Sequence, residues 1–167
     1  SQAPDWIVVK NRDHAYYHTV YHKSYPDATY YLRLNLANGW SNSSGSLFWN
    51  STAPTSSVFS IGTADGVNKS TKKIVAYCWH EVDGFSKFGS YVGSANANGP
   101  LIYTGFKPAW IMIKRNDGSA QWFMFDNKRN LINPVDKNLR ANQTNADSTT
   151  TAIDFLSNGF KIRHNAS

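Results

Sequence analysis

The sequence predicts an all-β protein, a sandwich or jelly roll, from three observations. Short runs of β-branched, aromatic and other apolar residues recur along the chain, separated by turn-forming Gly, Asn, Asp and Pro. No segment has a sustained helical periodicity, and Pro134 limits the one candidate helix, over residues 126–137. A strand pattern near the beginning also returns in the second half. Many short strands joined by such turns are typical of β-sandwiches and jelly rolls.

The clearest predicted strand lies in residues 105–117, GFKPAWIMIKRND. Its unbroken apolar run, WIMI, has the pattern of a strand packed on both faces, and an Asp-Gly turn signal follows it. Residues 3–13, APDWIVVKNRD, repeat this stretch: the Pro, the Trp and the exit Lys each recur 104 residues later. The repetition indicates that these residues are scaffold and not an active-site motif.

The repeat extends over two related series of strands. The L-R-x-N sequence of residues 32–35 returns at residues 139–142, 107 residues later, and residues 58–61 resemble residues 159–162. Val20-Tyr21 also matches Met124-Phe125 with the same spacing of 104 residues. One strand order therefore runs through both halves of the chain.

Each series lacks strands that the other has. The first closes with a strand over residues 74–79, whereas only the second has leading strands, within residues 85–104. We therefore predict two repeat units, residues 1–82 and 83–167. They either form separate modules or complete one another within one sandwich or across subunits, because open strand edges invite pairing. A piece of a longer repeat array would show the same pattern.

The other strands are predicted from runs rich in β-branched and aromatic residues. Residues 30–36 alternate, which predicts a half-buried strand with Tyr31 and Arg33 on its polar face. Residues 74–79 are predicted to be buried, with Cys78 as an inert core thiol that has no cysteine partner. Further strands are predicted over residues 6–9, 16–22, 47–49, 58–61, 85–92, 101–104, 121–125, 139–142, 152–156 and 160–163.

Charge and composition argue against several classes of protein. Hydrophobic residues make up 41% of the 167 residues, so the chain can bury a core. The net charge is +6, but the basic residues are scattered, which argues against nucleic-acid binding and favours a mild attraction to acidic glycans. No apolar run reaches the roughly 20 residues of a membrane span. The first residues also lack the pattern of a signal peptide.

Several motifs together resemble a known type of module. They are F-x-P-x-W-[IV]-x-[IV]-K, L-R-x-N, N-G-F-x-[IL] and V-A-Y-C-W, and residues 84–115 are the most specific part. The chain resembles the tandem concanavalin-like (lectin/glucanase-like) β-sandwich repeats of marine tailed-phage structural proteins, notably tail-fibre and other virion appendage proteins. The resemblance runs from Pro4 to Arg163. It implies a concanavalin-like jelly-roll sandwich and a role in the virion, with host-surface recognition, but no catalytic site.

Enzymatic chemistry has little support in the sequence. Retaining glycoside hydrolysis needs two carboxylates roughly 5–5.5 Å apart, and the glucanases that share this sandwich carry theirs as E-x-D-x-x-E. The chain has a single glutamate, Glu81, in the unrelated sequence HEVDGF, and its aspartates are spread through turns. No G-x-S-x-G, G-x-G-x-x-G or P-loop sequence is present. We therefore predict no catalytic residues.

No metal or cofactor is predicted. His14, His18 and His22 recur every fourth residue and would share one face of a helix. Their segment is predicted as a strand, however, where residues four apart lie roughly 13 Å from one another, too far to bind one ion. No D-x-[DN]-x-[DN]-G calcium loop occurs.

Glycan binding is the most plausible ligand chemistry, because aromatic faces stack on sugars while Asn, Asp and Arg supply hydrogen bonds. Trp40 lies in the polar stretch NGWSNSSG, where a core role is less natural. Trp6, Trp79 and Trp110 are predicted to be core residues. The candidate ligand-binding residues are Trp40, Trp49, Tyr31, Arg33 and Trp122.

These observations predict a non-enzymatic structural protein of a phage virion: a tail-fibre, head-fibre or decoration module. It would assemble in the host cytoplasm as a homo-oligomer with other virion proteins and would recognise host-surface polysaccharide. A free carbohydrate-binding lectin is the first alternative and a polysaccharide depolymerase is the second.

Overall fold

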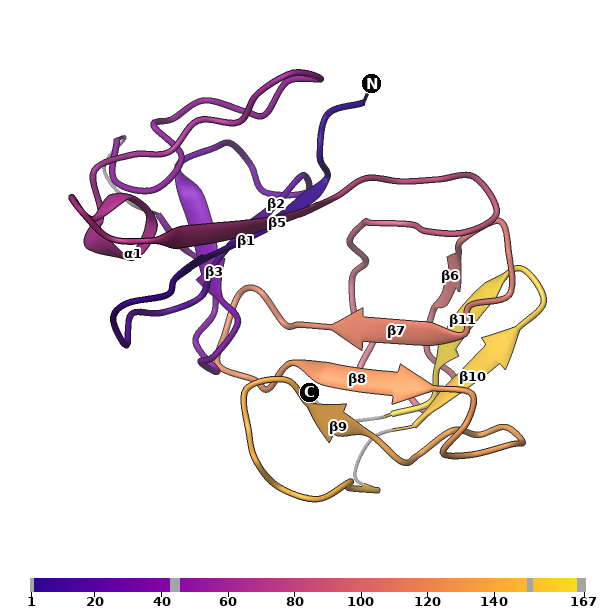
Figure 1. Ribbon diagram of the computed structural model, residues 1–167. Helices are drawn as coiled ribbons and strands as arrows, with labels where there is room; N and C mark the ends of the chain where they lie inside the picture. The colour runs from indigo at the N-terminus through magenta and orange to yellow at the C-terminus, as the bar shows by residue number, and fades with distance from the viewer. Residues whose placement is uncertain (1, 43–45, 150–151, 165–167) are drawn as a thin grey trace. The chain divides into compact units, whose positions relative to one another are not determined.

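The computed structural model describes residues 2–42, 46–149 and 152–164, and the chain divides into two compact units (Figure 1). Unit 1 comprises residues 1–81 with 115–120, and unit 2 comprises residues 82–114 with 121–167. The sequence predicts a boundary after residue 82 and gives no sign that residues 115–120 belong with unit 1. There, the Trp40 N–H donates to the Asn116 carbonyl at 2.7 Å and the Ala120 N–H to the Ala37 carbonyl at 2.9 Å.

Both units are built from short antiparallel strands, so the predicted all-β class is confirmed. In unit 1 the elements are β1 (Trp6–Asn11), β2 (Thr19–His22), β3 (Tyr30–Arg33), β4 (Ser41–Asn42), α1 (Asp65–Asn68) and β5 (Ile74–Trp79). In unit 2 they are β6 (Leu101–Tyr103), β7 (Trp110–Ile113), β8 (Phe123–Asp126), β9 (Leu139–Arg140), β10 (Ile153–Leu156) and β11 (Gly159–Ile162).

Unit 1 has one five-stranded sheet, in the order β4-β3-β2-β1-β5. The apolar residues Ile7 and Val9 of β1 join Tyr21 of β2 in its core, and Trp49 and Val67 pack with them from the connection between β4 and β5. Val67 lies in α1 and is fully buried. The short helix therefore belongs to the layer that covers one face of the sheet.

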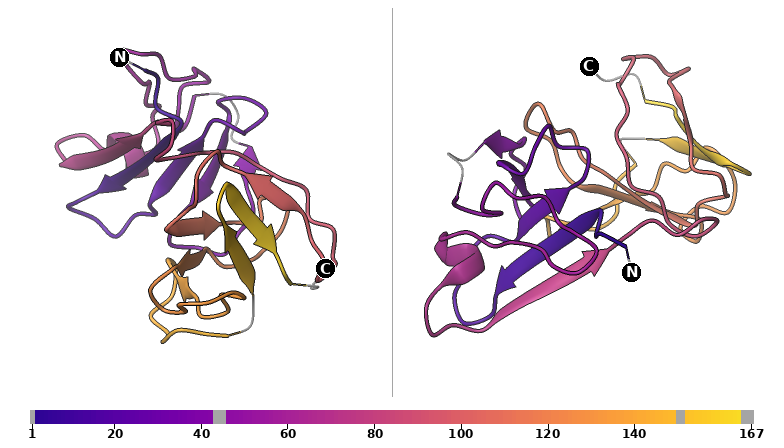
Figure 2. Two further views of the ribbon diagram at one scale, coloured as in Figure 1. Left: turned by 90° about the vertical axis from the view of Figure 1, so that its right-hand side faces the viewer. Right: turned by 90° about the horizontal axis from the view of Figure 1, so that it is seen from above.

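Unit 2 has two three-stranded sheets, β7-β8-β9 and β10-β11-β6. Its core joins Ile111 and Phe125 of the first sheet to Ile153, Phe155 and Phe160 of the second. The β10–β11 hairpin, yellow in Figure 2, turns at the Asn158-Gly159 pair that the sequence predicts. A core shared by two sheets gives this unit the character of a β-sandwich.

The internal repeat is present at the level of strand register. In unit 1, Ile7 lies opposite Tyr21, and in unit 2 Ile111 lies opposite Phe125. All four residue pairs of the β1–β2 ladder have counterparts in the β7–β8 ladder, 104 residues further on. The next ladder also corresponds, since Arg33 pairs with Thr19 and Arg140 pairs with Phe123.

The asparagine of each L-R-x-N sequence has the same structural role in both units. Asn35 Oδ1 accepts a hydrogen bond from the His18 N–H at 3.0 Å, and Asn142 Oδ1 accepts one from the Trp122 N–H at 3.1 Å. Each asparagine therefore connects the end of one strand to the beginning of its neighbour. This structural role explains why L-R-x-N recurs, and no bound ligand is needed to account for it.

Several predicted elements differ from the structure. Residues 47–49, 58–61 and 85–92 form no strand. Residues 126–137 form no helix: Asp126 ends β8, and turns and bends follow it. The case of residues 58–61 has a clear reason. Their counterpart, β11, pairs with β10 and β6, whereas the described part of unit 1 has no strand that corresponds to β6.

The predicted burial of three tryptophans and of the β5 strand is largely wrong. Trp79 is 41% exposed and Trp110 is 52% exposed, while Trp6 is half-buried. Cys78 is exposed, so it is not a core thiol. Both β5 and β7 are edge strands in their sheets, so each has a strand neighbour on one side only. Aromatic and β-branched residues suit such edges as well as a central strand, and the sequence pattern does not separate the two.

The shared role of the two asparagines predicts that Asn142→Ala will destabilise unit 2. It leaves the Trp122 N–H without its side-chain acceptor, so the free energy of unfolding should fall by about 1–2 kcal/mol. Urea denaturation followed by tryptophan fluorescence measures this change, with Asn98→Ala, at an exposed loop position, as the control. Equal stabilities for the two variants would contradict the role of Asn142.

Candidate binding site

A hollow of about 180 Å³ in unit 1 brings aromatic and charged side chains together. It is bordered by the end of β3, the segment before β2 and the beginning of α1. Its lining residues are Tyr16, Tyr17, Thr19, Arg33, Phe48, Ala64, Asp65 and Gly66. We call it the Arg33 hollow, after the arginine that lines it.

Aromatic rings hold the guanidinium of Arg33 in place. Its central carbon lies 4.2 Å from the centre of the Tyr17 ring and 5.3 Å from that of Tyr31. Arg33 Nη2 also donates to the Tyr31 hydroxyl at 3.5 Å, and the Tyr31 ring packs on Phe48 with centroids 4.1 Å apart. A guanidinium stacked on aromatic faces loses little freedom when it donates hydrogen bonds to a ligand.

Asp65 provides the opposite charge at the hollow. Its Oδ2 accepts hydrogen bonds from Lys69 Nζ at 2.5 Å and from the Tyr16 hydroxyl at 3.0 Å. These bonds lower the pKa of the Asp65 carboxyl, and the bond to Asp65 raises the pKa of the Tyr16 phenol. Buried Asn11 donates to the Asp65 carbonyl at 3.3 Å, which fixes α1 to the end of β1.

The Arg33 hollow therefore combines aromatic faces, phenol hydroxyls, a carboxylate and a guanidinium. Such a set can stack on the C–H face of a sugar and exchange hydrogen bonds with its hydroxyl or carboxylate groups. Among residues 2–42, 46–149 and 152–164, no group of three or more His, Cys, Asp or Glu side chains is arranged to hold a metal ion.

Of the predicted ligand residues, Arg33 lines this hollow, and Tyr31 contacts Arg33 without lining it. The structure does not support Trp49 and Trp122 as ligand contacts, because their side chains are only 2% and 4% exposed. Trp49 packs edge-on against Tyr21 in the core of unit 1, with ring centroids 5.7 Å apart. Both tryptophans flank polar stretches in the sequence, but tertiary packing turns their rings inward.

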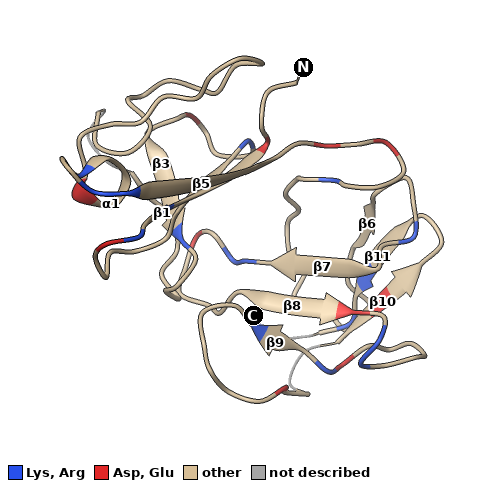
Figure 3. Cartoon of the chain, in the orientation of Figure 1, with Lys and Arg blue, Asp and Glu red and all other residues tan. Residues whose placement is uncertain are grey.

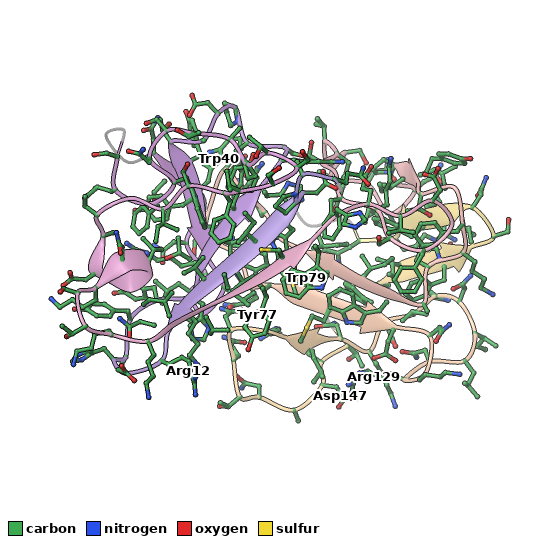
Figure 4. The ribbon with its side chains drawn as sticks, turned by 45° about the horizontal axis from the view of Figure 1, so that its top comes forward. Arg12, Trp40, Tyr77, Trp79, Arg129 and Asp147 are labelled. Atoms are coloured by element: carbon green, nitrogen blue, oxygen red, sulfur yellow. The ribbon has the colours of Figure 1, made fainter. Side chains whose placement is uncertain are left out.

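Trp40 is half-buried in a separate aromatic cluster of unit 1. Its ring centroid lies 5.2 Å from that of Tyr30 and 6.1 Å from that of Tyr25. Burial raises the pKa of the Tyr25 phenol. Trp40 is labelled in Figure 4 and does not line the Arg33 hollow. Its packing supports a structural role in holding the connection after β3.

Tyr16, Tyr17 and Asp65 were not predicted as site residues. Two signals in the sequence point toward them. Adjacent tyrosines before a strand are unusual for a polar connection, and Asp65 with Lys69 has the i,i+4 spacing of a helical ion pair. Neither signal shows that the two segments meet, because residues 16 and 65 come together only through the fold of unit 1.

A second concave surface in unit 1 lies along β5. Its volume is about 210 Å³, and its apolar lining includes Pro4, Val58, Phe59 and Trp79. The Trp79 ring lies 4.6 Å from that of Trp6, and it stacks on Tyr77 with centroids 6.0 Å apart. Tyr77 and Trp79, both labelled in Figure 4, share one face of β5 and are largely exposed. We call this surface the β5 groove.

The single glutamate takes part in an ion cluster. Lys23 Nζ lies 2.6 Å from Glu81 Oε1 and 3.3 Å from Asp5 Oδ1, and the Glu81 N–H donates to Asp5 Oδ2 at 2.7 Å. Burial alone would lower the pKa of Lys23, but its hydrogen bonds to Glu81 and Asp5 raise it. The cluster joins the start of β1 to the ends of β2 and β5, so Glu81 has a clear structural role.

His22, beside this cluster, is held in its neutral form. Its Nδ1 accepts a hydrogen bond from the Ser24 N–H at 3.0 Å, which places the proton of the neutral ring on Nε2. Burial, with a smaller contribution from the charge of Lys23, lowers the pKa of His22 to about 4. Among the described residues, His14, His18 and His22 are not grouped in a way that could hold a metal ion.

The charge distribution agrees with the scattered pattern of the sequence. Figure 3 shows Lys and Arg on strands and loops of both units, interspersed with Asp and Glu. The described residues form no long basic helix of the kind that tracks a nucleic-acid backbone. They also contain no helix with the length and hydropathy needed to span a membrane.

Comparison with protein-family models identifies the family of this chain. The family described as "Domain of unknown function (DUF7483)" matches residues 1–167, which is the whole chain. Neither the curated proteins nor the solved structures contain a significant match.

The depressed pKa of His22 predicts a pH-dependent stability. Between about pH 6.5 and 4 the unfolded chain binds a proton at this ring that the folded chain does not. The free energy of unfolding should therefore fall by about 2–3 kcal/mol as the pH drops through this window.

Urea denaturation at pH 7, 5.5 and 4.5 measures this loss as the difference between the wild type and His22→Asn, whose amide oxygen can still accept from the Ser24 N–H. The variant should lose less stability on acidification. His14→Asn, at an exposed ring, is the control and should follow the wild type. Parallel pH profiles for wild type and His22→Asn would contradict the assignment.

Proposed function

We propose that this chain, which belongs to the family described as a domain of unknown function (DUF7483), is a non-enzymatic binding and assembly module of a phage virion. In this proposal it is a concanavalin-like jelly-roll module of a tail fibre, head fibre or decoration layer. It assembles with copies of itself and with other virion proteins, and it recognises host-surface polysaccharide. The sequence motifs support the virion assignment, and the Arg33 hollow carries the proposed recognition.

The side chains of the Arg33 hollow are suited to binding a glycan. The Tyr17 ring is 46% exposed, and the Arg33 guanidinium lies on it at 4.2 Å. An exposed aromatic face next to a fixed, planar donor is suited to a sugar ring and its polar substituents. The guanidinium and the net charge of +6 favour a glycan that carries carboxylate groups, such as a uronic acid polymer.

The repeat adds a second line of support. Arg140 occupies the position in β9 that Arg33 occupies in β3. It lies 5.6 Å from the Phe123 ring and donates to Gln143 Oε1 at 2.9 Å, and it does not line the hollow. The arginine is thus a repeated scaffold feature, and only unit 1 surrounds it with Tyr16, Tyr17 and Asp65. A difference between copies of a scaffold is where recognition is expected.

The ion cluster favours binding over hydrolysis. Glu81 and Asp5, two carboxylates held near one another, share the ammonium of Lys23. A glycoside hydrolase needs two carboxylates that flank a substrate cleft, whereas these two are joined through one ammonium where the start of β1 meets the ends of β2 and β5. A free lectin is the first alternative, and it would bind a glycan at the Arg33 hollow without belonging to a virion. A polysaccharide depolymerase is the second, and it would cleave the glycan bound there.

This proposal predicts that Arg33→Ala will weaken the glycan binding that the wild type shows. A panel of purified bacterial surface polysaccharides, neutral and acidic, is screened against the full chain, and the affinity for any hit is measured by calorimetry. Loss of the stacked donor should weaken binding by at least about tenfold. Arg140→Ala removes the equivalent arginine of unit 2 and should leave the affinity unchanged.

Four outcomes would contradict parts of the proposal. Absence of binding to every polysaccharide would reject glycan recognition. Equal losses of affinity in Arg33→Ala and Arg140→Ala would exclude the Arg33 hollow as the site. A loss of affinity only in Trp79→Ala would also exclude it and would favour the β5 groove. Release of reducing ends from a bound polysaccharide would favour the depolymerase.

A further inference from the structure

We infer that the open edge of β7 is an acceptor for an antiparallel strand of the β5 type, supplied by another repeat of this module. The inference concerns assembly and does not depend on the proposed glycan recognition. It rests on the correspondence between the two units, in which one copy of the acceptor strand is already occupied.

The occupied copy is β1. This strand pairs with β2 on one side and with β5 on the other, through six residue pairs from Trp6–Trp79 to Asn11–Ile74. In unit 2 the corresponding strand, β7, keeps the same register with β8. Within the parts of the chain that the structure describes, however, β7 has no strand on its other side. The position that β5 fills beside β1 thus has no counterpart beside β7.

Backbone geometry identifies the groups at this edge. In an antiparallel strand, the N–H and C=O of alternate residues point to opposite neighbours. In unit 1 the Lys23 N–H donates to the Asp5 carbonyl on the β2 side, and the Arg12 N–H donates to the Lys73 carbonyl on the β5 side. In unit 2 the Asn127 N–H donates to the Ala109 carbonyl in the same way. The alternation directs the backbone groups of Trp110 and Met112 to the open edge.

Corresponding side chains of β1 and β7 differ in exposure, as expected if β7 lacks the neighbouring strand that β5 provides beside β1. Trp6 is half-buried and its ring stacks on Trp79 of β5 at 4.6 Å. Its counterpart Trp110 is 52% exposed. Val8, opposite Tyr77 of β5, is 6% exposed, whereas its counterpart Met112 is only partly buried. A strand with an aromatic residue at each of these two positions would cover both side chains.

The side chains of β7 also include none of the residue types that usually prevent pairing at an edge. Natural edge strands carry inward charges, Pro or bulges that prevent addition of a further strand. The four residues of β7, WIMI, include neither a charge nor a Pro. Main-chain hydrogen bonds would supply affinity and the side-chain pattern would supply specificity, as in other cases of strand addition. The β5 sequence, IVAYCW, has that pattern.

A synthetic peptide with the sequence of residues 72–81, carrying Cys78→Ser to prevent oxidation, tests the inference on the full chain. We expect saturable binding by calorimetry. Amide exchange followed by NMR should show the N–H groups of Trp110 and Met112 protected at least about tenfold by the bound peptide. A matched peptide with Tyr77→Pro, which lacks the N–H that would face Met112, should not bind.

Two variants of the protein locate the contact. Met112→Pro removes an edge donor at a position where an edge strand tolerates proline, and Trp110→Ala keeps the backbone but removes the aromatic partner. Each should weaken peptide binding by at least about tenfold, while Met112→Leu binds like the wild type. Protection of the Phe125 amide reports that β7 and β8 remain paired, and Trp110→Ala decides the matter if Met112→Pro disrupts that pairing.

The inference is overturned if the peptide shows no saturable binding, if the Tyr77→Pro peptide binds equally well, or if neither acceptor variant weakens binding. It is also overturned if the peptide protects amides elsewhere and leaves Trp110 and Met112 unchanged. Exchange of the peptide for β5 beside β1 would give that last result, because the affected amides would then lie in unit 1.

Discussion

The structure depends on one antiparallel strand pair that the chain forms twice. Ile7 opposite Tyr21 and Ile111 opposite Phe125 place an aliphatic residue against an aromatic ring at the centre of each core. A slip of one residue would turn these side chains to the opposite face, so burial itself maintains the register. The other strands of each unit assemble on this pair, and the two units differ in which strands they add.

The strands and connections that each unit adds to this pair distinguish the repeated scaffold from the candidate binding residues. Both copies keep an arginine beside the central pair, Arg33 in β3 and Arg140 in β9. Only in unit 1 do two connections meet around that arginine: α1 places Asp65 there, and the segment before β2 places Tyr16 and Tyr17 there. In unit 2 the added strands β10 and β11 contribute to the core instead. The same scaffold therefore offers a concave polar surface in one unit and a two-sheet core in the other.

Much of the strand framework was predictable from the sequence, and the reason is local. The apolar runs, the Asn-Gly turn before β11 and the recurrent L-R-x-N motif each carry their structural role within a few residues. The failures concern pairing over long distances. Residues 58–61 resemble β11 but have no third strand beside them, and residues 74–79 look like a central strand but lie at an edge. Composition cannot show whether a neighbour is present.

The sequence by itself determined the all-β class, the repeat and the nomination of Tyr31 and Arg33, because period-two patterns and turn residues act locally. Only the tertiary structure decided which aromatic residues are accessible: Trp49 and Trp122 are buried, whereas Tyr17, Tyr77 and Trp79 are exposed. It also decided that Asp65 meets Arg33 at one hollow. Side-chain exposure depends on what the rest of the chain places above a strand, and a strand's own sequence does not contain that information.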